Sequence, residues 1–305
     1  MKIIFMGTPD FAVYSLDAIK ERGDEILLVI SQEDRPRDRG KKIQPTPVKK
    51  RAEELGIEVY QPKSIKSDEA FEKISSLSPD LIVVTAYGQI VSKRILDLPR
   101  YGCINVHASL LPKYRGAAPI HYALIYGEEK TGITTMYMSE GLDTGDMILK
   151  DEINIAEKDT LQTLHDKLAL LSKGTLTKTI GQIEQGTAPR IPQTERDSTY
   201  ASLIKKEMGH IDFSKTPKEI RNLSRALSTY AILDENTVKL WGAEEGVCTE
   251  RSNYGEILQV HKDNIEVVAK GGTVKFYEIQ FPNKKRMRVE DFLKGNSIEE
   301  GQILK

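Results

Sequence analysis

The chain begins with a short apolar run, a glycine turn and an amphipathic segment, and this order restricts the fold strongly. Residues 2–6 predict a strand, residues 7–9 interrupt it, and residues 10–22 predict a helix with apolar side chains at helical spacing. A second strand follows at 25–31, and the apolar, β-branched run 81–85 is typical of a strand buried on both faces. This alternation predicts a Rossmann-like α/β domain in the N-terminal part of the chain.

The turn after the first strand does not have the composition of a dinucleotide-binding loop. It contains one glycine, Gly7, and a proline, Pro9, in place of the spaced glycines of the G-x-G-x-x-G pattern. The sequence therefore lends little support to a dinucleotide cofactor.

Residues 103–107 alternate like a strand, with Ile104 and Val106 on one face and Asn105 and His107 on the other. Side chains two residues apart on a strand point the same way, roughly 7 Å apart, so an amide donor and an imidazole face one space. A tight turn follows this strand. Polar side chains at the C-terminal end of a strand, followed by such a turn, occupy the place where open α/β sheets bind ligands.

Asp143 is the best candidate for a third member of this group, because it lies in a polar loop between two strand-like runs. Asn105, His107 and Asp143 together suit an acyl-transfer site. The amide would donate to a developing oxyanion, the imidazole would move a proton, and the carboxylate would orient the imidazole. No Ser or Cys nucleophile stands out, so direct transfer to an amine is more economical than a covalent intermediate. Spacing alone leaves a purely structural role open.

The C-terminal part of the sequence has a different pattern. The polar segment 186–200 contains two prolines and has no clear period, which is typical of a linker. A helix is predicted at 216–227, and short alternating runs follow it, which indicates a small β-barrel. We therefore predict a catalytic domain at residues 1–188, a linker at 189–207 and a smaller β-barrel domain at 208–305.

The formal net charge of −1 gives no general indication of a nucleic-acid partner, so any such surface must be local. Between residues 33 and 51 there are eight basic residues against three acidic ones. This run is either a solvated charged loop or an arm that grips an RNA backbone through Arg and Lys, and the sequence alone favours neither. The short basic run at 284–288 leaves the same two alternatives.

Composition excludes several other classes of protein. The two cysteines, Cys103 and Cys248, lie far apart, and we expect reduced thiols rather than a disulfide framework. The five histidines are scattered without metal-ligand spacing, so no metal is expected. No stretch approaches the roughly 20 apolar residues of a membrane span, and the first apolar run is too short for a signal peptide. We expect a cytoplasmic monomer with no membrane association.

A long motif surrounds the candidate site. It reads Asn-Val-His-Ala-Ser-Leu-Leu-Pro at 105–112 and Arg-Gly-Ala-Ala-Pro-Ile at 115–120, with Gly-Leu-Asp-Thr-Gly-Asp downstream at 141–146. These residues resemble the formyltransferases that use 10-formyltetrahydrofolate. The opening Ile-Ile-Phe-Met-Gly-Thr-Pro-Asp-Phe-Ala at 3–12 narrows the resemblance to the methionyl-tRNA formyltransferases, and it covers nearly the whole chain.

The resemblance implies transfer of a formyl group from 10-formyltetrahydrofolate to the free amino group of methionyl-initiator tRNA, for translation initiation. Asn105 and His107 would stabilise the tetrahedral oxyanion, and His107 would also help to protonate the departing folate nitrogen. Asp143 would orient His107 and assist proton removal. The folate co-substrate would be lined by Tyr87 and Gly88 at a strand end, by Gly141 and Leu142, and by the turn Ser109, Leu110, Leu111 and Pro112.

The resemblance also implies how the RNA is held. The loop at 33–51 would contact the acceptor stem of the initiator tRNA, and the C-terminal domain would be an OB-fold-like barrel, a fold often used to bind RNA. The implied contact residues are Arg35, Arg37, Arg39, Lys41 and Lys42 in the loop and Lys284, Lys285 and Arg286 in the barrel.

Two other functions compete with this interpretation. One is a formyl-folate enzyme that acts on glycinamide ribonucleotide or a sugar amine, but such a small amine needs neither the basic loop nor the C-terminal barrel. The other is a non-catalytic RNA-binding protein with a relic Rossmann domain. The presence of Asn105, His107 and Asp143 argues against it.

Overall fold

The computed structural model describes residues 1–37 and 42–305, and the described residues cluster into two compact units. The first unit comprises residues 1–119, 130–154 and 163–201, and the second comprises residues 120–129, 155–162 and 202–305. Among the described residues, no helix combines the length and apolarity that a membrane span requires.

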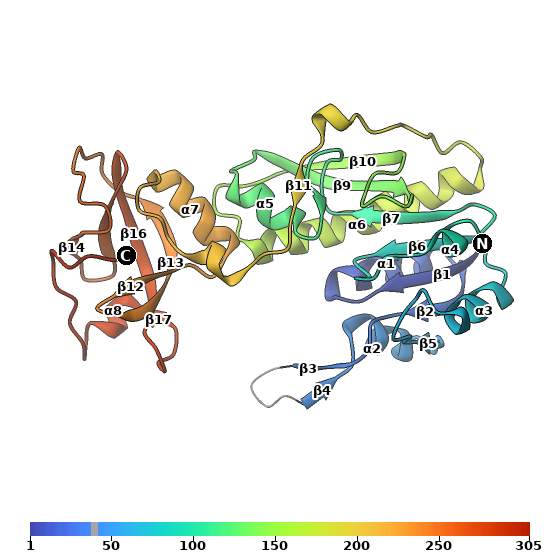
Figure 1. Ribbon diagram of the computed structural model, residues 1–305, viewed down its shortest axis with the longest axis horizontal. Coiled ribbons are helices and arrows are strands. Elements are labelled where there is room, and N and C mark those ends of the chain that lie inside the picture. The colour runs from blue at the N-terminus through green and yellow to red at the C-terminus, as the bar shows by residue number, and fades with distance from the viewer. Residues whose placement is uncertain (38–41) are drawn as a thin grey trace. The chain divides into compact units, whose positions relative to one another are not determined.

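The first unit is built on a seven-stranded sheet in the order β10-β9-β7-β6-β1-β2-β5 (Figure 1). The strands from β7 to β5 run parallel, and β9 is antiparallel to both β7 and β10. Their bounds are β1 Lys2–Gly7, β2 Glu25–Ile30, β5 Val59–Tyr60, β6 Leu81–Thr85, β7 Cys103–His107, β9 Lys130–Tyr137 and β10 Met147–Asn154. The predicted Rossmann-like α/β sheet is confirmed.

The chain's local sequence explains this arrangement. Every residue of β6 is buried, as expected for a central parallel strand covered on both faces. The helices of this unit are α1 Asp10–Glu21, α2 Pro47–Glu54, α3 Asp68–Ser76, α4 Lys93–Leu96 and, for most of its length, α6 Leu161–Glu184. Helix α2 starts where Thr46 accepts a hydrogen bond from the backbone N–H of Lys49, with Pro47 in the first turn.

Two short strand pairs extend from this sheet. Strands β3 (Arg35–Arg37) and β4 (Lys42–Gln44) pair antiparallel within the basic loop. Strand β8 (Arg115–Gly116) pairs in parallel with β11 (Tyr200–Ala201), and Met147 forms an isolated antiparallel bridge with Ile191. Residues 189–201 therefore have partners within the first unit, although their sequence has no regular period.

The second unit contains a six-stranded antiparallel sheet, which forms a half-barrel where the sequence predicted a small OB-fold-like β-barrel. Its strand order is β12-β13-β16-β15-β14, with β17 paired to β16. The bounds are β12 Tyr230–Leu233, β13 Asn236–Glu245, β14 Ile257–Val260, β15 Ile265–Ala269, β16 Gly272–Gln280 and β17 Met287–Arg288. One apolar core fills it and includes Val238, Leu240, Val274 and Phe276.

Helices flank this antiparallel sheet, namely α7 Pro217–Ala226 and α8 Val289–Phe292, while most of α5 (Pro119–Ile125) also belongs to the second unit. Helix α7 begins with a capping box. The Thr216 hydroxyl accepts from the Glu219 N–H, and the Glu219 carboxylate accepts from the Thr216 N–H at 2.9 Å.

Candidate active site

Strand β7 presents the two polar side chains that the sequence singled out. Asn105 lies opposite Met136 of β9 and His107 opposite Thr134, while Ile104 and Val106 are buried on the other face. His107 is 6% exposed, and Asn105 is half-buried. The alternation of the strand thus places an amide and an imidazole side by side, as predicted.

The loop between β9 and β10 brings Asp143 to these two residues. Its Oδ1 accepts a hydrogen bond from Asn105 Nδ2 at 3.3 Å, and its Oδ2 accepts one from the backbone N–H of Gly116 at 2.8 Å. Its Oδ2 also lies 3.7 Å from His107 Nδ1. Residues remote in the sequence therefore converge on one carboxylate.

The second nitrogen of the His107 ring determines which nitrogen takes part in chemistry. Nε2 lies 2.8 Å from the carbonyl oxygen of Tyr114. A carbonyl can only accept, so Nε2 carries a hydrogen and donates it. In the neutral ring, Nδ1 is then the unprotonated nitrogen. It faces Asp143 and is the atom free to gain and release a proton.

This cluster has the parts that acyl transfer to an amine requires. The Asn105 amide can donate to an oxygen that becomes negative, and His107 Nδ1 is placed to exchange a proton with a reacting group. Both donors to Asp143 are held by backbone structure, because Asn105 lies within β7 and the Gly116 N–H belongs to β8. The group is therefore preorganised.

The predicted folate-lining residues in the turn after β7 differ in how far they are exposed. Ser109 and Leu111 are buried, and the Ser109 hydroxyl donates to the Lys113 carbonyl at 2.7 Å. Leu111 packs with Met136 and Met147. Leu110 and Pro112 are partly exposed. The first pair thus supports the turn, and the second pair can offer a surface to a ligand.

A cavity of about 820 Å³ lies at the start of β7 and beside the loop that follows β9, and Asn105, His107 and Asp143 are not among its lining residues. Among its lining residues are Cys103, Met138, Gly141 and Arg190. Cys103 lies two residues before Asn105 and therefore on the same face of β7, while Gly141 belongs to the loop that carries Asp143. The cavity is within the size range of small-molecule sites.

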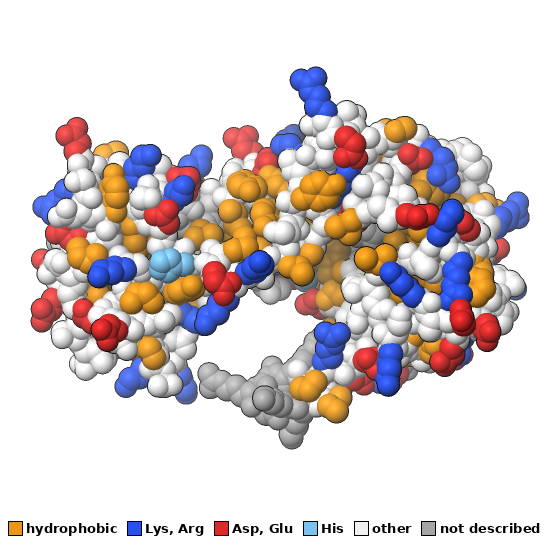
Figure 2. Space-filling model, in the orientation of Figure 1, with side chains coloured by type: hydrophobic (Ala, Val, Ile, Leu, Met, Phe, Trp, Pro, Cys, Tyr) orange, Lys and Arg blue, Asp and Glu red, His pale blue; other side chains and the backbone are white. Residues whose placement is uncertain are grey.

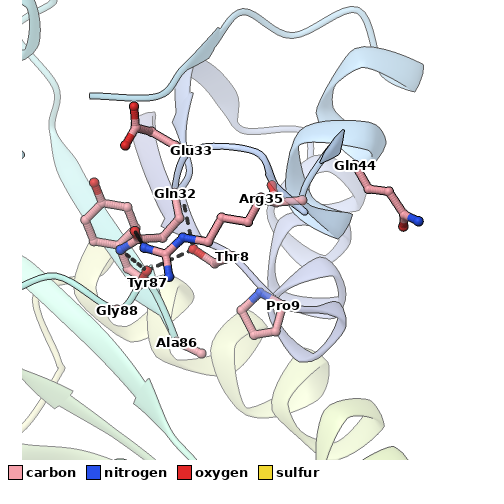
Figure 3. A pocket seen from close by; sticks show the side chains of 10 residues that line it. Thr8, Pro9, Gln32, Glu33, Arg35, Gln44, Ala86, Tyr87 and Gly88 are labelled. Atoms are coloured by element: carbon pink, nitrogen blue, oxygen red, sulfur yellow. Dashed lines mark hydrogen bonds between the residues drawn. The ribbon is translucent and has the colours of Figure 1, made fainter. Parts of the chain in front are cut away.

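A smaller pocket of about 320 Å³ lies where the parallel strands β1, β2 and β6 end (Figure 3). Tyr87, Gly88, Gln32 and Arg35 are among its lining residues. The Tyr87 carbonyl accepts hydrogen bonds from Thr8 Oγ1 at 2.8 Å and from Gln32 Nε2 at 3.2 Å. Strand order reverses at β1, and such a switch point is a usual ligand site in open α/β sheets.

The Tyr87 side chain itself turns away from solvent. It is 2% exposed and packs in the core cluster that contains Met6 and Val84. Burial raises the pKa of its phenol, so the hydroxyl stays neutral at physiological pH. Tyr87 contributes to the pocket wall, and its backbone carbonyl is already engaged. Leu142, by contrast, is 60% exposed beside Asp143.

The predicted RNA-contacting residues lie in both units. Arg35 is exposed in β3, Arg37 and Lys42 lie at the ends of β3 and β4, and Arg39 and Lys41 fall outside the described residues. Lys284, Lys285 and Arg286 are exposed. The Arg286 guanidinium lies over the Trp241 ring, 4.5 Å from its centroid, and pairs with Glu278. Basic and acidic side chains are interspersed over the face in Figure 2.

Two residues with no assigned role in the sequence interpretation also contact the site. Gln193 Nε2 donates to the backbone carbonyls of Asp143 and Gly145, and Arg115 Nε donates to Gln193 Oε1. Arg115 opens the motif at 115–120, but the sequence does not identify a partner for it. Gln193 lies in a polar segment without a regular period, and no feature of the sequence indicated a role for it. Among the described residues, no cluster of His, Cys, Asp and Glu could hold a metal ion.

The two cysteines should differ sharply in reactivity. Cys103 is buried, and burial raises the pKa of its thiol, so little reactive thiolate forms near neutral pH. Cys248 is exposed. We expect iodoacetamide at pH 8 to label Cys248 and to leave Cys103 unmodified until the protein is unfolded. Peptide mass spectrometry checks this, and labelling of Cys103 in the folded protein at the rate of Cys248 would contradict it.

Comparison with known proteins agrees with the fold. The sequence matches the family Formyl transferase over residues 1–180 and Formyl transferase, C-terminal domain, over residues 203–297. The N-formyltransferase from Helicobacter canadensis in complex with folinic acid and dTDP-3-aminofucose has a TM-score of 0.67 and 19% identity. It covers 94% of this chain and 100% of its own. The chain therefore has the fold of a formyl transferase and belongs to that class.

Relatives in sequence narrow this class. The methionyl-tRNA formyltransferase of Clostridioides difficile (strain 630) is 50% identical over the whole of both chains. That of Alkaliphilus oremlandii (strain OhILAs) is 48% identical over all of this chain and 99% of its own. The chain belongs to the methionyl-tRNA formyltransferase family.

Proposed function

We propose that this protein transfers the formyl group of 10-formyltetrahydrofolate to the free amino group of methionyl-initiator tRNA. The observation that carries the proposal is the convergence of Asn105, His107 and Asp143, with Asp143 held by the Asn105 amide and the Gly116 N–H. Relatives of this name, about half identical over the full chain, supply the substrate pair.

The donor would occupy the larger cavity. Its volume of about 820 Å³ suits a ligand of folate size, and its lining includes Cys103 on the strand that carries Asn105 and Gly141 in the loop that carries Asp143. Gly141, Leu142, Leu110 and Pro112 would line the donor on the side of the cluster. When bound, the folate supplies an activated formyl carbon.

The chain's own groups then act on the transfer. The attacking amine must be neutral, and a free α-amino group with a pKa of about 8 meets this condition without a strong base. Asn105 Nδ2 would donate to the oxygen of the tetrahedral intermediate. His107, held by the Tyr114 carbonyl, would move a proton at Nδ1, and Asp143 would orient the ring.

The acceptor would reach the site from the edge where the parallel strands end. The smaller pocket there combines Tyr87 and Gly88, predicted to contact folate, with Arg35, predicted to contact tRNA. The basic loop and Lys284, Lys285 and Arg286 would bind the RNA backbone. Catalytic and RNA-binding domains at 1–188 and 208–305, a linker at 189–207, a monomeric state and a cytoplasmic location complete the proposal.

A formylation assay tests the proposal directly. The purified protein is incubated with 10-formyltetrahydrofolate and either methionyl-initiator tRNA, methionyl-elongator tRNA or an amino sugar nucleotide. We expect formylmethionine to form on initiator tRNA and much less product with the other acceptors. Equal or better turnover of the amino sugar would identify the protein as a sugar formyltransferase instead.

The salt dependence of tRNA binding tests the basic loop. Replacing Arg37, Arg39, Lys41 and Lys42 together by glutamine should weaken binding and reduce the slope of log K against log salt by about 3, since each lost phosphate contact removes about 0.7–0.9. Filter binding at several KCl concentrations measures both quantities.

A matched variant separates the loop from overall charge. It removes four exposed lysines elsewhere in the first unit, Lys2, Lys20, Lys63 and Lys66. We expect this control to keep the wild-type slope. If the loop variant and the control change the slope equally, the loop does not lie in the RNA interface.

A further inference from the structure

The backbone of Asp143 is in an unfavourable conformation. Its φ is +53°, in the left-handed region that residues other than glycine seldom adopt. Its carboxylate contacts Asn105 and Gly116 in this loop shape. An interaction with the loop backbone would favour the shape further.

Gln193 contacts that backbone directly. Its Nε2 donates to the carbonyl oxygens of Asp143 and Gly145, each at 2.8 Å. These two carbonyls flank Thr144, so one amide group closes the turn that carries Asp143. The loop is also tightly packed at this point, because a Cβ on Gly145 would lie 1.7 Å from the Tyr137 carbonyl oxygen.

The orientation of the Gln193 amide is fixed from both ends. Ile191 exchanges backbone hydrogen bonds with Met147 at 2.8 and 3.0 Å, which attaches the segment to the start of β10. Arg115 Nε donates to Gln193 Oε1 at 2.9 Å. Because Arg115 can only donate, it holds the oxygen of the amide toward itself and the NH₂ group toward the Asp143 loop.

A contribution to the stability of the fold does not explain why the Arg115 side chain is buried. Its side chain is fully buried, yet its carboxylate partner Glu195, at 2.8 Å from Nη1, is 72% exposed. Its Nη2 has no hydrogen-bond partner among the described residues. A buried guanidinium with incomplete pairing costs desolvation energy that such contacts recover only in part. A positioning role for Arg115 accounts for this arrangement better than a structural one.

We propose that Arg115 and Gln193 are positioning residues that hold the Asp143 loop in its reactive conformation, which rests on the proposed function for what Asp143 does. Both residues of β8 then help to hold Asp143. The Gly116 N–H binds its carboxylate, and the adjacent Arg115 holds its backbone through Gln193.

Three variants separate the parts of this network. Gln193→Glu keeps an acceptor for Arg115 and removes both N–H donors to the loop. Gln193→Met, of similar length, removes donors and acceptor together. Arg115→Met removes the orienting cation without leaving a buried charge, because Glu195 is exposed. Gln185→Glu, at an exposed glutamine of the same unit, is the matched control.

We expect each of the three variants to lower kcat by about 10- to 100-fold while KM for both substrates stays within about twofold. Gln185→Glu should behave as the wild type. A structural role alone would lower the melting temperature and the yield of folded enzyme without changing kcat per folded molecule. That result would overturn the proposal.

Hydrogen exchange of the Gly116 amide gives a readout that needs no activity. This N–H is protected by Asp143 Oδ2, so displacement of the loop in Gln193→Glu should speed its exchange, with no change in the Gln185→Glu control. Exchange as slow as in the wild type would also overturn the proposal. If the wild type formylates no tRNA, the proposed function fails, while this measurement still tests whether Gln193 holds the Asp143 loop.

Discussion

Replacement of Asn105 by aspartate is expected to lower kcat about 100- to 1,000-fold, equivalent to about 3–4 kcal/mol of transition-state stabilisation. The substitution keeps the shape of the side chain. It removes both N–H donors of the Asn105 amide, one bonded to Asp143 Oδ1 at 3.3 Å and one available to a developing oxyanion, and it sets a second carboxylate beside Asp143. Steady-state formylation kinetics with purified tRNA measure the effect.

Two observations make the Asn105 result specific. Asn154→Asp, the same change at an exposed residue of β10, should leave kcat at the wild-type value. Asn105→Ala removes the donor without adding charge, and it should be slow as well. If Asn105→Ala retained near-normal turnover with an intact fold, the amide would have no part in stabilising the oxyanion.

Replacement of His107 by glutamine should reduce kcat about 100- to 10,000-fold. Glutamine can place an N–H near the position of Nε2 and keep the contact with the Tyr114 carbonyl, but nothing replaces Nδ1 opposite Asp143. Asparagine can place an amide group near the position of Nδ1, but it loses the contact with the Tyr114 carbonyl. Both variants should be slow, because neither amide can take up and release a proton.

The control for His107 is His165→Gln. His165 lies on α6, packs edge-on against Phe11 and has no contact with the site residues described above. Its replacement should leave turnover unchanged. If His107→Asn or His107→Gln turned over substrate at a rate close to that of the wild type, proton transfer would have to be assigned to another group.

The sequence predicted those parts of the site that follow from local periodicity. Alternation within a strand is a local property, so the shared face of Asn105 and His107 could be predicted before the structure was known. The apolar run of β6 indicated a buried parallel strand for the same reason. The approach of Asp143 does not follow from local periodicity, because it depends on the antiparallel pairing of β9 with β10 and on the loop between them reaching Asn105.

Contacts that backbone atoms provide were not predictable in this way. The Tyr114 carbonyl and the Gly116 N–H fix His107 and Asp143, but every residue carries these groups and no side-chain pattern marks them. The role of Gln193 was not predictable either. Its contact with the Asp143 loop depends on a bridge between Met147 and Ile191, and the segment that contains Ile191 has no regular period. Long-range register, rather than residue type, determines these contacts.

The pairing of β11 with β8 has a practical consequence for anyone who recombines this chain with a relative. A crossover placed at the two prolines, where composition changes most visibly, would join Gln193 and Tyr200 of one parent to Arg115 and Gly116 of the other. A crossover after Ala201 keeps all four from a single parent. Chimeras joined there should keep these contacts around Asp143 intact while residues 202–305 are exchanged.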